Sequence, residues 1–345
     1  MDAADPSAAS GTERAGHVPG RERDADPALQ LAAATGGDRV ALARLLSSVE
    51  RGGDRGRAVA GLAYRSGGEA WTVGITGAPG AGKSTLTSRL VGEARLHEPG
   101  PLAVLAVDPS SPFSGGAILG DRIRMQDHAL DEEVYIRSMA TRGHLGGLTS
   151  AVPEAIRVLA ASGFPLVLVE TVGVGQVEVE VASATDTTVV VVNPRWGDAV
   201  QANKAGLLEV ADLFVINKAD LPGARETRRD LDQMLDLSVL GDWRPPIIET
   251  VASTGEGVET LWEAVGRHRA SLADRGLLEA HRRDRLEREL RQILSARIGQ
   301  EIEALCAGDT FGEVVAAVVE GRTDPYEAAD DLIGRVGRTG AGPPA

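Results

Sequence analysis

The residues best suited to chemistry form a glycine-rich loop that ends in a lysine and two hydroxyl side chains. The sequence reads GAPGAGKST over 77–85, which fits the pattern G-x-x-x-x-G-K-[ST]. In such a loop the glycines let backbone N–H groups turn inward around a diphosphate, and the following helix adds the positive end of its dipole. The sequence therefore predicts a nucleotide site made of Gly77, Ala78, Pro79, Gly80, Ala81, Gly82, Lys83, Ser84 and Thr85.

Two side chains of this loop have distinct expected roles. Lys83 would reach the β- and γ-phosphates of a nucleoside triphosphate, and the Ser84 hydroxyl would bind Mg²⁺. The alternative is a glycine-rich turn that binds nothing. An apolar run before the loop and a helix-like stretch after it favour the phosphate site.

A second motif, Asn217-Lys218-Ala219-Asp220, predicts which base is bound. A carboxylate at Asp220 can accept hydrogen bonds from N1–H and the amino group of guanine, and adenine offers neither donor. A site built around such bonds rejects the wrong ligand by about four to five orders of magnitude. Asn217 would support the loop and the N7/O6 edge, and the stem of Lys218 would cover the base. The alternative is a solvated turn after a strand.

Three acidic residues stand where metal ligands are expected. Asp108 and Glu170 each follow an apolar run, at the predicted carboxyl ends of parallel strands, where α/β sheets bind ligands. Asp121 follows a stretch rich in Ser and Gly. Mg²⁺ prefers oxygen ligands and keeps several waters, so Ser84 with some of these acids would suffice, although a single acid at a strand end can also cap a helix. The expected catalytic residues are Lys83, Asp108 and Glu170.

A parallel sheet has to position these residues. Nearly continuous apolar runs occur at 71–76, 102–107, 164–169, 187–192, 213–216 and 246–249, as is typical of strands covered on both faces. Helix-like stretches at 83–96, 151–161, 199–210 and 224–236 lie between several of them. This alternation predicts an α/β, doubly wound and mostly parallel sheet domain over 71–270.

Helical segments are expected on both sides of that domain. Residues 1–27 lack large apolar side chains and are expected to be a disordered tail. An N-terminal helical extension follows at 28–70, with helices at 38–50 and 56–65 that precede the main domain rather than belong to it.

Beyond residue 270, apolar side chains repeat every four residues from Leu286 to Ile302 and predict one helix at about 277–306. Two shorter helical pieces complete the segment 271–335, and 336–345 is expected to be a tail. The long helix can pack on its own domain or serve as a dimerisation arm, and its periodicity does not decide between the two.

Composition limits the classes of function. Of 345 residues, 36 are Lys or Arg and 50 are Asp or Glu, so the net charge is −14, and no nucleic-acid partner is expected because phosphates are repelled. The single cysteine, Cys306, excludes an intramolecular disulfide and fits a cytoplasmic protein. No apolar run is long enough for a membrane helix, so no membrane partner is expected.

Several segments together resemble the methylmalonyl-CoA mutase-associated GTPases (MeaB/MMAA type, formerly ArgK type), which are SIMIBI-class P-loop GTPases. The resemblance runs from about residue 38 to 335. It is carried by GITGAPGAGKSTL (74–86), VDPSSPFSGGAILGDRIRM (107–125), MATRGHLGGL (139–148), ETVGVGQVEVEV (170–181), NPRWGDAVQANKAGLLEVADLFVINKADLPGA (193–224) and DPYEAADDLI (324–333).

The resemblance implies a P-loop NTPase core with an N-terminal helical extension and a C-terminal helical dimerisation arm, hence a homodimer. It implies hydrolysis of GTP to GDP with Mg²⁺ as cofactor, coupled to guarding an adenosylcobalamin-dependent acyl-CoA mutase, by default methylmalonyl-CoA mutase. The implied nucleotide and metal residues are Lys83, Ser84, Asp108, Asp121, Glu170, Asn217, Lys218 and Asp220.

The chain departs from the family pattern at two places. The loop on the base side reads Val251-Ala252-Ser253 instead of Ser-Ala/Gly-Leu, and Val177 stands where Ser is usual. No Gln directly follows Gly173, and Gln176 is three residues further on, so slow turnover is expected without a partner. Candidate elements for coupling to that partner are Arg142, Asp198, Gln201 and Lys204.

Three other functions compete with this one. A nickel-delivery GTPase would need His- or Cys-rich clusters, whereas this chain has six scattered His and one Cys. A transport-associated kinase of the older ArgK assignment would need a protein phospho-acceptor, which no feature of the sequence favours. A scaffold that binds GTP and barely hydrolyses it is the non-enzymatic alternative.

Overall fold

The core of the protein is one parallel β-sheet. The computed structural model describes residues 26–109, 128, 130–141, 151–171, 184–194, 210–238 and 242–339. Within them, seven strands pair in the order β3-β2-β4-β1-β5-β6-β7, and every pairing is parallel. The strands are β1 (Trp71–Gly77), β2 (Leu102–Pro109), β3 (Val134–Thr141), β4 (Leu166–Thr171), β5 (Thr187–Val192), β6 (Leu213–Asn217) and β7 (Ile247–Thr250). The predicted α/β fold is confirmed.

Helices cover both faces of the sheet. On one face α4 (Lys83–His97) and α10 (Val258–Asp274) share a core with Val189 and Val215. On the other face α6 (Ala151–Ala161) packs beside β4, and α9 (Ala224–Leu237) packs beside β5 and β6. Since both faces are buried, the strands read as continuous apolar runs. Of the predicted helix 199–210, all but Val210 lies outside the described residues.

Strand β3 was not predicted from the sequence. It is an edge strand that pairs only with β2, in register from Leu102↔Val134 to Pro109↔Thr141. Arg137 and Ser138 interrupt its apolar run, as an edge position tolerates. The sequence of β3 is therefore not a continuous apolar run of the kind that marks the interior strands.

The N-terminal helices belong to the same packed unit as the sheet. Helices α1 (Pro27–Thr35), α2 (Arg39–Arg51) and α3 (Gly53–Ser66) share one hydrophobic core with β2, β4 and α6. Leu45 and Leu46 of α2 are fully buried. Helix α1 was not predicted, and it begins inside the expected tail 1–27: Pro27 is its first residue, and Asp26 caps it by accepting the N–H of Ala28 at 2.9 Å. Residues 1–25 lie outside the described part of the chain.

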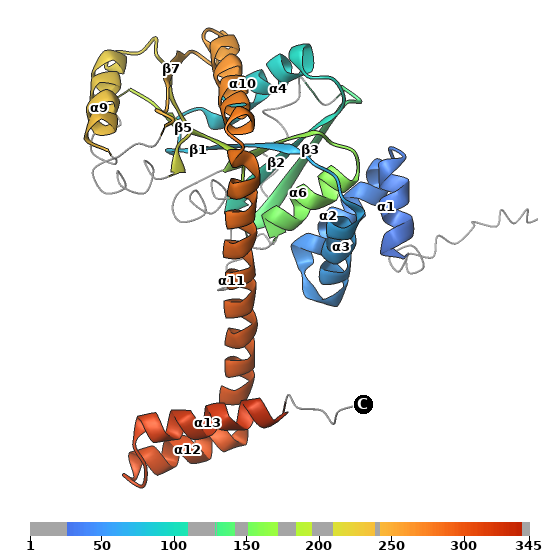
Figure 1. Cartoon of the computed structure of the whole chain (residues 1–345), viewed down its shortest axis with the longest axis vertical. Coiled ribbons are helices and arrows are strands. Elements are labelled where there is room, and N and C mark those ends of the chain that lie inside the picture. The colour runs from blue at the N-terminus through green and yellow to red at the C-terminus, as the bar shows by residue number, and fades with distance from the viewer. Residues whose placement is uncertain are drawn as a thin grey trace, which may run out of the picture.

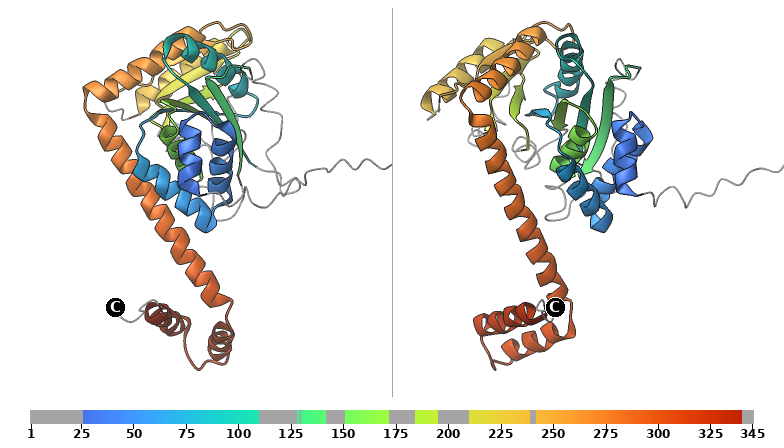
Figure 2. Two further views of the ribbon diagram at one scale, coloured as in Figure 1. Left: turned by 90° about the vertical axis from the view of Figure 1, so that its right-hand side faces the viewer. Right: turned by 45° about the vertical axis from the view of Figure 1, so that its right-hand side comes forward.

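The C-terminal helices project away from the sheet (Figures 1 and 2). Helix α11 (Leu277–Cys306) has the predicted bounds, and α12 (Asp309–Val319) and α13 (Pro325–Thr339) follow it. We call residues 277–339 the arm. Helix α13 runs four residues into the expected tail 336–345, because a single glycine such as Gly337 weakens a helix without ending it. No helix in the described ranges is both long and apolar enough to cross a membrane.

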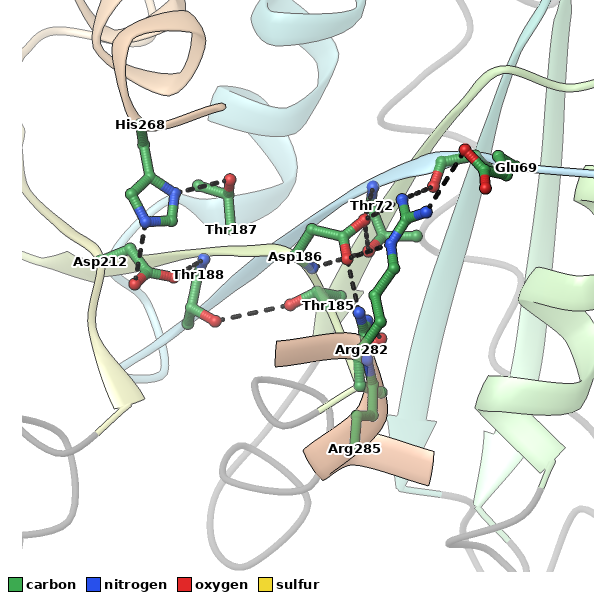
Figure 3. A network of polar contacts seen from close by, with 12 residues as sticks. Glu69, Thr72, Thr185, Asp186, Thr187, Thr188, Asp212, His268, Arg282 and Arg285 are labelled. Carbon is green, nitrogen blue, oxygen red and sulfur yellow. Dashed lines mark hydrogen bonds and ion pairs between the residues drawn. The ribbon is translucent and has the colours of Figure 1, made fainter. Parts of the chain in front are cut away.

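A buried carboxylate fastens the arm to the sheet (Figure 3). Asp186 accepts hydrogen bonds from Arg282 and Arg285 of α11, and from both the backbone N–H and the hydroxyl of Thr72 in β1. Burial alone would raise the pKa of Asp186, but the two arginines outweigh burial and lower it below its usual value of 3.8. The root of α11 is therefore held by charge at the start of β1.

A second contact joins α11 to α6, in the opening between the arm and the helical extension. Arg157 of α6 pairs with Glu289, the one buried residue of α11 among those described. Glu154 lies one turn before Arg157. Burial raises the pKa of Glu154 to about 7; Arg157 opposes the rise and Glu289 adds to it. Near neutral pH the Glu154 carboxyl beside this ion pair is therefore partly protonated.

We expect Asp186→Ala to destabilise the protein by about 2–4 kcal/mol, because it leaves two arginines without their buried partner. Urea unfolding at pH 7 measures the free energy of unfolding. Asp242→Ala is the matched control, since Asp242 pairs with Arg275 at 2.9 Å but is 87% exposed, and it should change stability by less than about 0.5 kcal/mol. Equal effects of the two variants would contradict the anchor.

We expect Glu154→Gln to remove part of the pH dependence of stability. A carboxyl whose folded pKa is raised costs stability as it ionises, so the native protein should lose about 2 kcal/mol between roughly pH 4.5 and 7 from this group. Unfolding in urea at pH 5 and pH 8 tests this. Glu263→Gln is the control, since Glu263 also lies near an arginine of its own helix but is 62% exposed. Parallel pH profiles for native protein and Glu154→Gln would refute the assignment.

Candidate nucleotide site

The glycine-rich loop connects β1 to α4 and has the backbone shape that the sequence predicts. Gly77 has φ of +130°, and a Cβ there would lie 2.0 Å from the carbonyl oxygen of Val191. Gly82 has φ of +91°, and a Cβ there would lie 2.4 Å from the side-chain nitrogen of Asn217. At both positions only glycine fits. The loop therefore packs directly against β5 and against the last residue of β6.

The two chemical side chains of the loop point to different partners. The Nζ of Lys83 lies 2.5 Å from the carbonyl oxygen of Gly77 and 3.1 Å from that of Ala78. The Ser84 hydroxyl donates to Oε1 of Glu170 at 2.5 Å. Lys83 and Ser84 are mostly buried and Glu170 is fully buried. The structure thus brings together the predicted phosphate-binding lysine, the hydroxyl and one of the predicted acids.

Asn217 joins this loop to the predicted base site. Its Nδ2 donates to the carbonyl of Ala81 at 2.7 Å, and its Oδ1 accepts from the N–H of Ala252 at 3.0 Å and the hydroxyl of Thr250 at 3.2 Å. Lys218 has φ of +61°, and its Nζ donates to the carbonyl of Gly80 at 2.8 Å. Asp220 is exposed in the turn after β6, free to meet a ligand.

The loop 251–253, which the family resemblance implies on the base side, lies beside Asn217. Val251 and Ala252 are buried and Ser253 is exposed. One residue that the sequence reasoning missed holds this loop: Arg89 of α4 donates from Nε to the carbonyl of Ala252 at 3.1 Å and from Nη2 to that of Ser253 at 2.9 Å. No local signal in the sequence points to this contact, because the two carbonyls lie far from Arg89 along the chain.

The remaining predicted residues fall into two groups. Asp108 lies in β2 with its backbone in register with Ala140, one strand away from β4, but its side chain is outside what the structure describes. The others lie outside the described residues altogether: Asp121, Arg142, Gln176, Asp198, Gln201 and Lys204.

The oxygen ligands present fit a magnesium ion. A hydroxyl and a carboxylate converge at the start of α4, and Mg²⁺ prefers such ligands together with water and phosphate oxygens. In the described ranges, His, Cys, Asp and Glu form no group of three or more able to hold a metal ion. Ser84 and Glu170 are the described oxygen ligands placed to hold Mg²⁺ beside a phosphate.

Comparison with known proteins decides the family. The model of the methylmalonyl-CoA mutase-associated GTPase MeaB matches residues 42–306. The chain belongs to this family. It is accordingly a GTPase, an enzyme that hydrolyses GTP.

Relatives agree with that assignment. A putative GTPase of Pyrococcus abyssi is 49% identical over 302 residues, which cover 86% of this chain and 93% of that protein. The GTPase ArgK of Escherichia coli is 37% identical over 269 residues, covering 74% and 80%. A crystal structure described as an LAO/AO transport system kinase superposes with a TM-score of 0.68 at 27% identity, covering 91% of this chain and 98% of that one.

We expect Glu170→Asp to lower GTP turnover at least about tenfold and to raise the Mg²⁺ concentration needed for half-maximal turnover, because the shorter side chain no longer reaches the Ser84 hydroxyl. Phosphate release at varied Mg²⁺ measures both effects. Lys83→Ala sets the zero level, since loss of one charge-stabilising group costs on the order of 10²–10³ in rate. Glu226→Asp, at an exposed position of α9, is the matched control. Native turnover and native Mg²⁺ dependence in Glu170→Asp would contradict the role.

Proposed function

We propose that this GTPase is a chaperone for an adenosylcobalamin-dependent acyl-CoA mutase, with methylmalonyl-CoA mutase as the default partner. It gates loading of the cofactor and protects the mutase. The family description supports an association with methylmalonyl-CoA mutase. The observation that carries the proposal is the 2.5 Å contact between Ser84 and Glu170, because Glu170 is the first residue of the family segment 170–181. We propose that a change at the phosphate site acts through this hydrogen bond on Glu170, the residue with which that segment begins.

The residues of the site divide the work of hydrolysis. The loop 77–82 binds the phosphates with its backbone, and Lys83 neutralises charge that develops on the β- and γ-phosphate oxygens. Ser84 and Glu170 would hold Mg²⁺, which supplies charge neutralisation when bound. Asp108, in the neighbouring strand, and Asp121 are proposed as further ligands. Catalysis is then positioning and charge stabilisation of an in-line attack by water.

Base selection belongs to the loops after β6 and β7. The Asp220 carboxylate accepts from N1–H and the amino group of guanine, and Lys218 covers the base with its stem. Asn217 spans the phosphate loop and the loop 251–253, so the base and the phosphates are bound by one connected frame. Arg142, Asp198, Gln201 and Lys204 are proposed to couple nucleotide state to the partner.

The arm is proposed to form a homodimer. Helix α11 exposes a ladder of apolar side chains, each 42–57% accessible, in the described chain: Leu286, Leu290, Leu294, Ile298 and Ile302. Solvent exposure of such a regular apolar row is unfavourable, and a second arm would cover it. The alternative that α11 packs on its own domain along its whole length is not favoured, since its contacts with the domain are at its root and Glu289 is its one buried residue among those described.

The mutase should accelerate GTP turnover, since added groups raise the rate of other slow GTPases by on the order of 10³–10⁵. The measurement is phosphate release with and without the cognate mutase, with Lys83→Ala as the blank. A pull-down from native extract with a non-hydrolysable GTP analogue identifies the mutase. Equal rates in the presence and absence of the captured mutase would overturn the coupling, and absence of single-turnover hydrolysis would favour a scaffold that only binds GTP.

A further inference from the structure

The loop between β7 and α10 uses nearly all of its backbone donors within the protein. Val251 donates its N–H to the carbonyl of Glu256, and Thr254 and Gly255 donate theirs to the carbonyl of Val251. Ala252 donates to Asn217. Among the hydrogen bonds of the described residues, Ser253 is thus the member of 251–255 whose N–H has no acceptor.

Arg89 fixes the direction of that one donor. The described chain contains no cis peptide bond, and in a trans peptide the C=O and N–H groups point in opposite directions. Because Arg89 binds the carbonyl of Ala252 at 3.1 Å, the N–H of Ser253 points away from Arg89. The second bond, to the carbonyl of Ser253 at 2.9 Å, holds the next peptide as well.

The fork of a guanidinium suits this task. Arginine presents several N–H donors in one rigid plane, so it can bind two carbonyl oxygens at once, whereas lysine offers a single point charge on a flexible stem. A carbonyl that accepts from a charged donor also polarises its peptide group, which strengthens the N–H on the other side. Arg89 therefore both orients the Ser253 amide and makes it a better donor.

We propose that Arg89 is a positioning residue for base recognition, and that it presents the Ser253 amide to the 6-oxo group of the purine. The proposal rests on the guanine site described above. The two halves of the base are then recognised by different groups. Asp220 accepts hydrogen bonds from N1–H and the 2-amino group, and the Ser253 amide, oriented by Arg89, donates to the oxygen at position 6. Arg89 also ties base recognition to α4, the helix that carries Lys83 and Ser84.

The affinities for three nucleotides distinguish the contribution of Asp220 from that of Arg89 and Ser253. GDP carries the 6-oxo and 2-amino groups, IDP keeps the 6-oxo group but lacks the 2-amino group, and ADP lacks both. For Arg89→Met we expect the affinities for GDP and IDP to fall by one common factor of about three- to tenfold, the size of one hydrogen bond, while the affinity for ADP stays unchanged. Competition against a fluorescent GDP analogue on the full-length protein gives all three dissociation constants.

Matched variants isolate the effect. Arg95→Met is the control, since Arg95 lies on the same helix and also binds a backbone carbonyl, that of Gly100 at 3.1 Å, away from the base loop; it should leave all three affinities unchanged. Arg89→Lys should fall between the native protein and Arg89→Met. Asp220→Ala should instead lower the ratio of GDP to IDP affinity, which Arg89→Met leaves intact.

The results that would overturn the inference are distinct from failure of the proposed function. Equal losses for GDP, IDP and ADP in Arg89→Met would mean that Arg89 supports the phosphate loop or the fold, and unchanged GDP and IDP affinities would mean that it supports nothing at the base. If the native protein did not prefer GDP over ADP, the guanine site itself would be wrong.

Discussion

The side-chain amide of Asn217 is the interaction on which the site depends. It donates to the phosphate loop at Ala81 and accepts from the base loop at Thr250 and Ala252, and it is almost fully buried. An amide can do this because it carries a donor and an acceptor on one rigid group. Two loops that are distant in sequence thereby become one surface, and Gly82 has no side chain so that Asn217 can approach it.

The sheet supplies the remaining precision. Strands β1, β4 and β6 all run parallel and end at the same edge, so Gly77, Glu170 and Asn217 emerge together from a rigid, doubly covered core. Each of these side chains or loops sits at a strand end rather than in a free loop. This is why a buried carboxylate and a hydroxyl can be held within hydrogen-bond distance of each other.

Much of this was readable from the sequence because each element had a strong local signature. The strands that lie in the sheet interior are continuous apolar runs, and the loop 77–85 has a pattern that indicates a phosphate-binding loop between a strand and a helix. The base loop 251–253 could be placed only by the family resemblance, since its residues have no chemistry of their own. The sequence did not predict contacts between residues that belong to no motif and are far apart along the chain.

Arg89, Thr250 and Asp186 are such residues. Nothing in the local sequence around Arg89 says that its guanidinium will meet two carbonyls more than 160 positions away. Strand β3 was missed because an edge strand is not required to be apolar throughout. The N-terminal helices were expected to precede the domain, yet their leucines complete its core, because hydrophobic packing is indifferent to the order of elements along the chain.

The way in which α11 is attached has a geometric consequence. A helix of 30 residues is about 45 Å long at 1.5 Å per residue, and its root is clamped by Arg282 and Arg285 to the beginning of the very strand that ends at Gly77. The clamp lies five to eight residues into the helix, so about 30–36 Å of it extends beyond the clamp, and a tilt of about 5° there would move the far end by about 3 Å. The arm therefore amplifies motion: a tilt too small to disturb the packing around β1 displaces α12 and α13 by about 3 Å.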